Sequence, residues 1–176
     1  YLSSGKGQEG ERTWEGDERA AKAMPFRPLA LRVLDARGRV ASQVPSTETV
    51  QIEFEYALES DITGLRIGLY LTTGRGEPVF TSFDTDAPEM FERMSARPRG
   101  RYVSRVTLPA NLLNEGTFLL GVNASAFRIR SFFSDEHALA FTVDGTGAPG
   151  SHWAEARGGP LRPALAWTIE RRADAA

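Results

Sequence analysis

Apolar and polar residues alternate along several short stretches of this chain. The clearest is residues 50–58, where every even-numbered position is apolar: Val50, Ile52, Phe54, Tyr56 and Leu58. Side chains of a strand point alternately to its two faces, so this stretch predicts a strand with one buried face and one solvated, acidic face. Similar patterns predict further strands at residues 29–33, 65–71, 101–108, 117–126 and 139–143.

Turn-forming residues separate these stretches. Residues 74–78 read Gly-Arg-Gly-Glu-Pro and predict a hairpin from 65–71 to a partner at 79–84. Asp86 and an early proline predict one or two helical turns over 86–94, with Asp86 as the N-cap. Residues 131–137 are expected to form a polar turn. About eight short strands with little helical periodicity predict an all-β fold, an antiparallel β-sandwich with immunoglobulin-like or jelly-roll topology.

The ends of the chain are more polar than its middle. Four glycines interrupt a charged run before Pro25, so residues 1–25 are expected to be a linker. Trp14 is the exception there, and a lone tryptophan in such a segment is expected to dock on its own domain or on a partner. The sandwich is expected over residues 26–170, with a final extended segment at 161–169 and a frayed tail at 171–176.

Composition narrows the classes of function. The chain has 176 residues, a net charge of −2 and no cysteine, which excludes disulfides and thiolate metal sites. No apolar run is long enough to span a bilayer. Balanced charge argues against general nucleic-acid binding, whose affinity comes mainly from neutralising phosphates.

Sequence patterns for catalysis are absent. Neither a P-loop nor a GxSxG motif occurs, and His137 and His152 are the only histidines. Glu53 and Glu55 fit a solvated strand face better than a glycosidase pair. The acidic run before His137 fits a solvated turn better than a metal site. We therefore expect a non-catalytic domain without cofactor or metal.

A candidate binding surface lies on the outward face of two predicted strands. Gly68 and Tyr70 point outward from 65–71, and Gly121, Asn123 and Ser125 point outward from 117–126. If these strands are neighbours, the glycines leave a flat floor from which a tyrosine ring and an amide rise, a combination that suits a sugar. Equally, the glycines permit sheet twist or a covering segment. The candidate residues are Tyr70, Phe83, Asp84, Asn123, Ser125 and Arg128.

Several motifs carry a family resemblance in this order along the chain. They are Arg-Val-Leu-Asp-Ala-Arg-Gly (32–38), Val-Gln-Ile-Glu-Phe-Glu-Tyr (50–56), Leu-Pro-Ala-Asn-Leu-Leu-Asn-Glu-Gly-Thr-Phe (108–118), Ala-Phe-Thr-Val (140–143) and Arg-Gly-Gly-Pro-Leu-Arg-Pro-Ala-Leu-Ala-Trp (157–167). Together they resemble the C-terminal carbohydrate-binding domain of Wzt-type ATPase subunits of bacterial O-antigen ABC exporters. The resemblance covers about residues 29–167, and its most distinctive parts are the P-x-N-L-L-N-x-G corner and the closing P-x-L-x-W.

The resemblance implies a function as well as a fold. It implies a β-sandwich that follows an ATPase domain and binds an O-polysaccharide glycan, often at its non-reducing end, on the cytoplasmic side of the inner membrane. Expected partners are the glycan, the ATPase domain, the transmembrane exporter subunit and a second copy, and the resemblance also implies exchange of the final strand between the two copies. The family's binding residues vary, so the candidates above rest on the face argument alone. The alternatives are a protein-interaction sandwich and, less favoured, a glycan-modifying enzyme.

Overall fold

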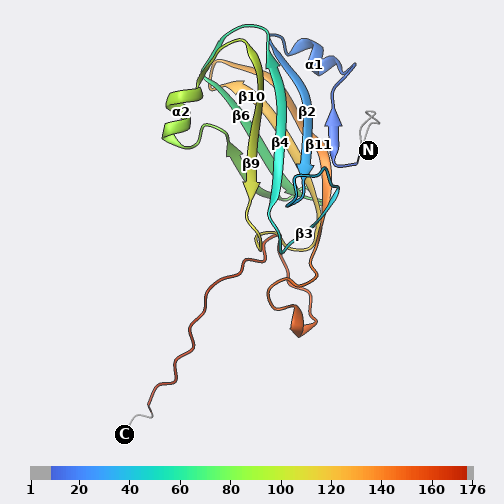
Figure 1. Cartoon of the computed structure of the whole chain (residues 1–176), viewed down its shortest axis with the longest axis vertical. Coiled ribbons are helices and arrows are strands. Elements are labelled where there is room, and N and C mark those ends of the chain that lie inside the picture. Colours follow the sequence, from blue (N-terminus) through green and yellow to red (C-terminus); the bar gives the residue numbers. More distant parts are fainter. Residues whose placement is uncertain (1–8, 174–176) are drawn as a thin grey trace.

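The computed structural model describes residues 9–173, which form two packed β-sheets (Figure 1). The first sheet contains, in spatial order, β1 (Glu11–Thr13), β2 (Phe26–Leu34), β4 (Val50–Leu58) and β9 (Gly100–Leu108). The second contains β3 (Gln43–Pro45), β11 (Arg130–Asp144), β10 (Gly116–Ala126), β6 (Leu65–Thr73) and β7 (Pro78–Phe83). β5 (Ile62–Thr63) pairs with β8 (Ala96–Arg97). The helices are α1 (Glu18–Lys22) and α2 (Pro88–Met94), and a 3-10 turn covers Ser151–Trp153.

The strand order is immunoglobulin-like. β2, β4 and β9 share one sheet, while β11, β10, β6 and β7 share the other, so the two hairpins β6–β7 and β10–β11 lie in the same layer. All sheet neighbours run antiparallel except β3, which pairs parallel with β11. The predicted antiparallel sandwich is confirmed, and the order selects the immunoglobulin-like topology over the jelly roll.

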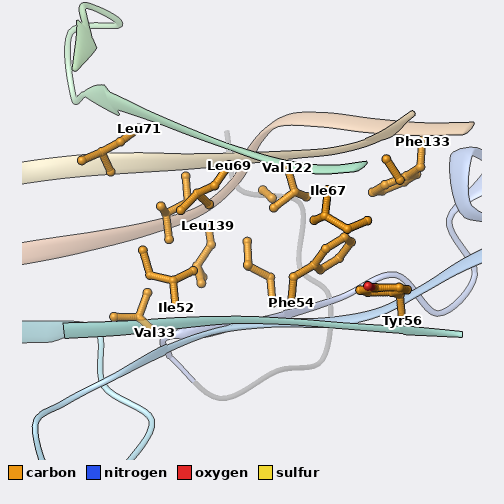
Figure 2. Packing of buried hydrophobic residues seen from close by; sticks show 14 of the residues in the cluster. Val33, Ile52, Phe54, Tyr56, Ile67, Leu69, Leu71, Val122, Phe133 and Leu139 are labelled. Carbon is orange, nitrogen blue, oxygen red and sulfur yellow. The ribbon is translucent and has the colours of Figure 1, made fainter. Parts of the chain in front are cut away.

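Alternation along the strands builds the core. In β4 every even-numbered residue is buried and every odd-numbered residue is partly exposed, as its sequence predicts. Its inward residues face those of the opposite sheet across the space between the layers, as Figure 2 shows for Phe54 and Ile67. Burying such side chains stabilises each by about 1.5–3 kcal/mol.

The segment from 130 to 144 differs from the prediction. Residues 131–137 are not a polar turn, because they continue β11, and the turn of the hairpin lies at residues 127–129. Register shifts between Leu120 and Val122 and between Ala124 and Ser125 mark irregularities in the β10–β11 pairing. A bulge interrupts simple alternation, which made this strand look polar and turn-like in the sequence.

The predicted helix after β7 is present, but its cap is not the expected one. α2 begins after Ala87, which caps it without a side-chain hydrogen bond. Asp86 instead accepts a hydrogen bond from the backbone N–H of Phe83 (2.9 Å), which closes the chain reversal at the end of β7.

The N-terminal segment also departs from the expectation of a linker up to residue 25. β1 pairs with β2, α1 follows, and Trp14 is only 3% exposed. The Trp14 ring packs edge-on against Phe54 and Phe133, and its indole N–H donates to Asp135 (2.9 Å). The tryptophan therefore docks on its own domain, and the folded body begins well before residue 26. Residues 1–8 of the expected linker lie outside the described residues.

The P-x-N-L-L-N-x-G corner contacts residues 157–162, which precede the closing P-x-L-x-W motif, at the other end of the sandwich. The Asn114 side chain donates to the backbone carbonyls of Arg157 (2.7 Å) and Gly159 (2.8 Å). The backbone N–H of Asn114 donates to the backbone carbonyl of Pro160 (2.9 Å). The Arg162 backbone N–H donates to the Leu112 carbonyl (2.9 Å). The P-x-N-L-L-N-x-G corner thus anchors residues 157–162 to the domain.

Beyond this anchor the chain leaves the sandwich at the end opposite the two helices (Figure 1). Residues 163–173 are exposed and have no assigned secondary structure, and Trp167 is 85% exposed. The expected extended segment at 161–169 is therefore attached to its own domain through its first two residues, by an isolated bridge between Leu161 and Leu113 and by hydrogen bonds from Arg162 to the carbonyls of Leu112 and Pro149. The last residues of the expected tail, 174–176, lie outside the described part. No helix within residues 9–173 is both long and apolar enough to cross a membrane.

Candidate functional site

β6 and β10 are neighbours in the five-stranded sheet, as the candidate surface requires. Their register places Asn123 opposite Gly68 and Gly121 opposite Tyr70, while β7 places Phe83 opposite Gly68 from the other side. Tyr70, Phe83 and Asn123 therefore share the face that points away from the core. The strand pairing brings together three of the six residues selected from the sequence.

A hydrogen bond joins two of these side chains. The Asn123 side-chain amide N–H donates to the Tyr70 hydroxyl oxygen (2.8 Å), so the hydroxyl hydrogen is left to donate to another acceptor. The Tyr70 and Phe83 rings meet edge to face, with centroids 6.4 Å apart. The geometry holds Tyr70 in one orientation and presents a donor on the face.

The glycines do not form the bare floor that the sequence allowed as one interpretation. A Cβ on Gly68 would lie 2.6 Å from the Asn123 carboxamide oxygen and 2.8 Å from the Phe83 ring. A Cβ on Gly121 would lie 2.7 Å from the backbone carbonyl oxygen of Glu136. Neighbouring groups cover both positions, so only glycine fits there. This agrees with the second interpretation of the sequence, in which another segment covers the glycines.

Arg66 is part of this surface, although it was not among the residues selected from the sequence. Its guanidinium lies over the Phe83 ring at 4.0 Å and over the Phe127 ring at 4.6 Å, and its Nε–H donates to the Ser125 hydroxyl (3.3 Å). Arg66 has the same strand parity as Gly68 and Tyr70, so alternation alone could have placed it on this face.

Ser125 and Arg128 join the surface through these contacts. Ser125 is only 9% exposed and lies opposite Arg66 in the strand register. Arg128 occupies the β10–β11 turn with φ 59°, and its guanidinium lies 5.0 Å from the Phe127 ring. We call the resulting surface the outer patch, formed by Arg66, Tyr70, Phe83, Asn123, Ser125, Phe127 and Arg128.

Asp84 is not on the outer patch. It follows Phe83 by one residue, and its carboxylate points between the sheets, where it pairs with the buried Arg97 (2.9 Å) and accepts from Ser104 (2.8 Å) and from the Ile67 backbone N–H (2.9 Å). Arg97 also donates to Tyr56. Both Asp84 carboxylate oxygens are therefore bonded within the protein, and the residue joins the two ends of the segment that carries α2.

Burial and charge act against each other in this network. Burial by itself would lower the pKa of Arg97, but the hydrogen bond to Asp84 and its charge outweigh that effect, and the pKa lies above its ordinary value. Burial also raises the pKa of Tyr56. Both groups keep their ordinary neutral-pH protonation, so the ion pair and its hydrogen bonds persist.

A cleft of about 520 Å³ lies between the edge strands β7 and β9 beside α2. Apolar side chains form most of its lining, among them Met90, Met94 and Val106, and its polar groups include the paired Asp84 and Arg97. Because these polar groups are already bonded to one another, the cleft offers little to a sugar hydroxyl. The outer patch fits a sugar better.

No group of three or more histidine, aspartate or glutamate side chains is close enough to hold a metal ion anywhere in residues 9–173. His137 is exposed on β11, and the carboxylates of Glu53 and Glu55 are engaged by arginines of their own sheet.

The fold and the outer patch define a class: an immunoglobulin-like β-sandwich domain with an aromatic and polar surface on its larger sheet. Within this class, a protein-family model described as the Wzt C-terminal domain matches residues 29–153. The chain therefore belongs to the Wzt C-terminal domain family, as its motifs indicated. No curated protein matches the sequence.

Solved structures agree on the fold. A crystal structure of the C-terminal domain of Wzt superposes with a TM-score of 0.67 at 16% identity, covering 83% of this chain and 84% of that one. A β-glucosidase from Listeria innocua in complex with glucose gives a TM-score of 0.41 at 15% identity, covering 68% of this chain but 16% of the enzyme. At that level the second similarity has no bearing on function.

Proposed function

We propose that this domain binds an O-antigen polysaccharide and thereby couples recognition of the finished glycan to its export by an ABC transporter. Membership of the Wzt C-terminal domain family is the observation that carries the proposal. The domain would recognise its ligand without changing it, since binding needs only shape, stacking and hydrogen bonds.

The outer patch is the surface we assign to the glycan. Sugars combine apolar C–H faces, which stack on aromatic rings, with hydroxyls that need donors and acceptors. Phe127 is 57% exposed and offers a ring, and Tyr70 offers a hydroxyl hydrogen. Asn123 orients that hydroxyl, and Ser125 and Arg128 extend the surface toward the β10–β11 turn. We assign the non-reducing end of the glycan to this patch because a chain end exposes the most polar groups to a shallow surface.

The partners follow from the same proposal. An ATPase domain would precede the sandwich, with residues before β1 as the connection, and the complex would sit at the cytoplasmic side of the inner membrane beside its transmembrane subunit. A homodimer would form by exchange of the final segment. Leu165, Trp167 and Ile169 alternate and are exposed, a pattern typical of a strand whose partner belongs to another chain.

Calorimetric titration tests the glycan assignment. The ligand is O-polysaccharide from the organism that encodes the chain, and the variants are Tyr70→Ala and Asn123→Ala. Each should weaken binding about tenfold, since Tyr70→Ala removes the hydroxyl that donates to the glycan and Asn123→Ala removes the hydrogen bond that orients this hydroxyl. Thr107→Ala, on the exposed outer face of the other sheet, is the matched control and should bind as the parent does. Unchanged affinity in both patch variants would move the site elsewhere on the domain.

A second candidate function is docking of a partner polypeptide. The β10–β11 turn exposes Phe127 (57%) and Ile129 (82%), an apolar tip that suits a protein contact. Loss of exporter assembly in Ile129→Ser with unchanged glycan binding would favour this role for the tip.

A further inference from the structure

Arg66 lacks the carboxylate partner that most other arginines on the strands have. Arg32 and Arg97 each pair with a carboxylate, while Arg66 has no ion pair among the described residues. Its contacts are two aromatic faces and one hydroxyl. A guanidinium has five donor hydrogens, and the Ser125 contact uses only the one on Nε.

The aromatic faces fix the position of this cation. With Phe83 at 4.0 Å and Phe127 at 4.6 Å, the guanidinium is held against two rings. A stacked guanidinium keeps its charge and its forked donors, which match the two oxygens of a carboxylate or phosphate group. The arrangement therefore positions a charged donor group and leaves its Nη atoms without a carboxylate partner.

Other cationic groups lie at the same end of the sheet. Arg128 lies 5.0 Å from the Phe127 ring, and Arg130 lies 4.7 Å from the Phe132 ring and donates to the Met24 backbone carbonyl. Neither has an ion pair within residues 9–173. The acidic residue Glu136 lies beside Gly121. Gly121 and Ser125 are four residues apart on β10, about 13 Å along the strand, so Glu136 lies away from the Arg66–Ser125 contact. Arg66, Arg128 and Arg130 thus gather at this end without an ion pair among the described residues. The nearby Asp84 carboxylate is paired with Arg97, and the Asp86 carboxylate accepts from the backbone N–H of Phe83.

We propose that the outer patch recognises an acidic group on the glycan, a carboxylate or a phosphate, and that Arg66 is its main contact with Arg128 in support. This rests on the proposed glycan-binding function and names the class of glycan. The oxygens of the acidic group accept hydrogen bonds from the Nη–H groups of Arg66. The Tyr70 hydroxyl donates to a neighbouring oxygen of the sugar, and the exposed Phe127 ring contacts the C–H face of the sugar.

The test compares three forms of the same O-polysaccharide: native, carboxyl-reduced and treated with hydrofluoric acid to remove phosphate. The full 176-residue chain is titrated with each form. We expect native glycan to bind about tenfold or more tightly than one of the two treated forms, since charge-assisted hydrogen bonds to an anion are lost. The form that loses affinity identifies the group as carboxylate or phosphate.

Variants assign the effect to the patch. Arg66→Gln should bind the native and neutralised glycans equally, and Arg128→Gln, in an exposed turn where folding is not at risk, should lose part of the preference. Arg75→Gln removes the same charge from the exposed β6–β7 turn and should keep the parental preference. Raised salt should weaken native binding in the parent more than in Arg66→Gln.

The outcomes separate this inference from the function on which it rests. Equal binding of all three glycan forms by the parent overturns the acidic-group assignment and leaves glycan binding in place. Absence of binding to the native glycan overturns both. A preference for the acidic form that survives Arg66→Gln and Arg128→Gln overturns the assignment to these residues.

Discussion

Trp14 provides the sharpest test of where the folded domain begins. Its ring is 3% exposed and packs against Phe54 and Phe133, and its N–H donates to the buried Asp135. Replacement by alanine removes this ring from the edge of the sandwich between β2 and β11 and leaves the Asp135 carboxylate without one donor. The expected result is a large loss of stability.

The magnitude follows from the buried area. A tryptophan buries about 150–250 Å², which at about 25 cal/mol per Å² corresponds to about 4–6 kcal/mol as an upper value. Substitutions of this kind cost about 3–5 kcal/mol in practice. We expect Trp14→Ala to lower the free energy of unfolding by about 4 kcal/mol, a large part of the roughly 5–15 kcal/mol typical of a domain. Trp14→Phe keeps most of the packing and should lose less.

The assay is urea unfolding followed by far-UV circular dichroism, because the substitution removes a fluorophore. Trp153 and Trp167 provide matched controls, since they are 70% and 85% exposed and their alanine variants should stay within about 0.5 kcal/mol of the parent. A Trp14→Ala variant as stable as Trp153→Ala would refute the packing of residues 11–23 on the sandwich.

Three further predictions concern stability. Asp84→Asn should lower the free energy of unfolding by about 3 kcal/mol, because it leaves Arg97 buried without its counterion. Glycan affinity measured by calorimetry should not change. Weakened binding with unchanged stability would indicate that Asp84 contacts the glycan. Gly121→Ala should lower the urea midpoint, since its Cβ would lie 2.7 Å from a backbone oxygen of β11, and a midpoint equal to the parent's would contradict that close approach. At low pH, Asp17 and Glu55 should both lose stabilising interactions. Hydrogen bonds from Arg19 lower the pKa of Asp17, and for Glu55 burial raises the pKa but hydrogen bonds from arginines outweigh it. Both folded-state pKa values lie below the unfolded ones. The two carboxylates therefore stabilise the domain above about pH 4–5, and this contribution is lost as the pH falls through the folded-state pKa values. Between about pH 6 and pH 3 the urea midpoint should fall less in Asp17→Asn than in the parent, and an equal fall in both would count against the pairing of Asp17 with Arg19.

The alternation of residues 50–58 is enough to determine β4, because the period of a strand is a local property of the chain. Alternation also determined that Tyr70 and Asn123 point outward. The same rule places Arg66 on the face of Tyr70, and it places Asp84 on the other face from Phe83. These two inferences require knowing at which residue each strand begins and ends, and sequence patterns define strand ends poorly.

Three features depended on contacts between distant parts of the chain. Residues 11–23 look like a linker because they are polar, yet one buried ring and the Asp135 carboxylate dock them on the sandwich. Residues 131–137 look like a turn, yet they continue β11 through irregular pairing with β10. The sequence by itself thus determined the long alternating strands β2, β4, β6, β9 and β10 and the family, since both depend on local order along the chain. Only the tertiary structure decided which side chains meet on the outer patch, because strand pairing joins Arg66, Phe83 and Asn123 from three separate strands and brings Phe127 to them from a turn.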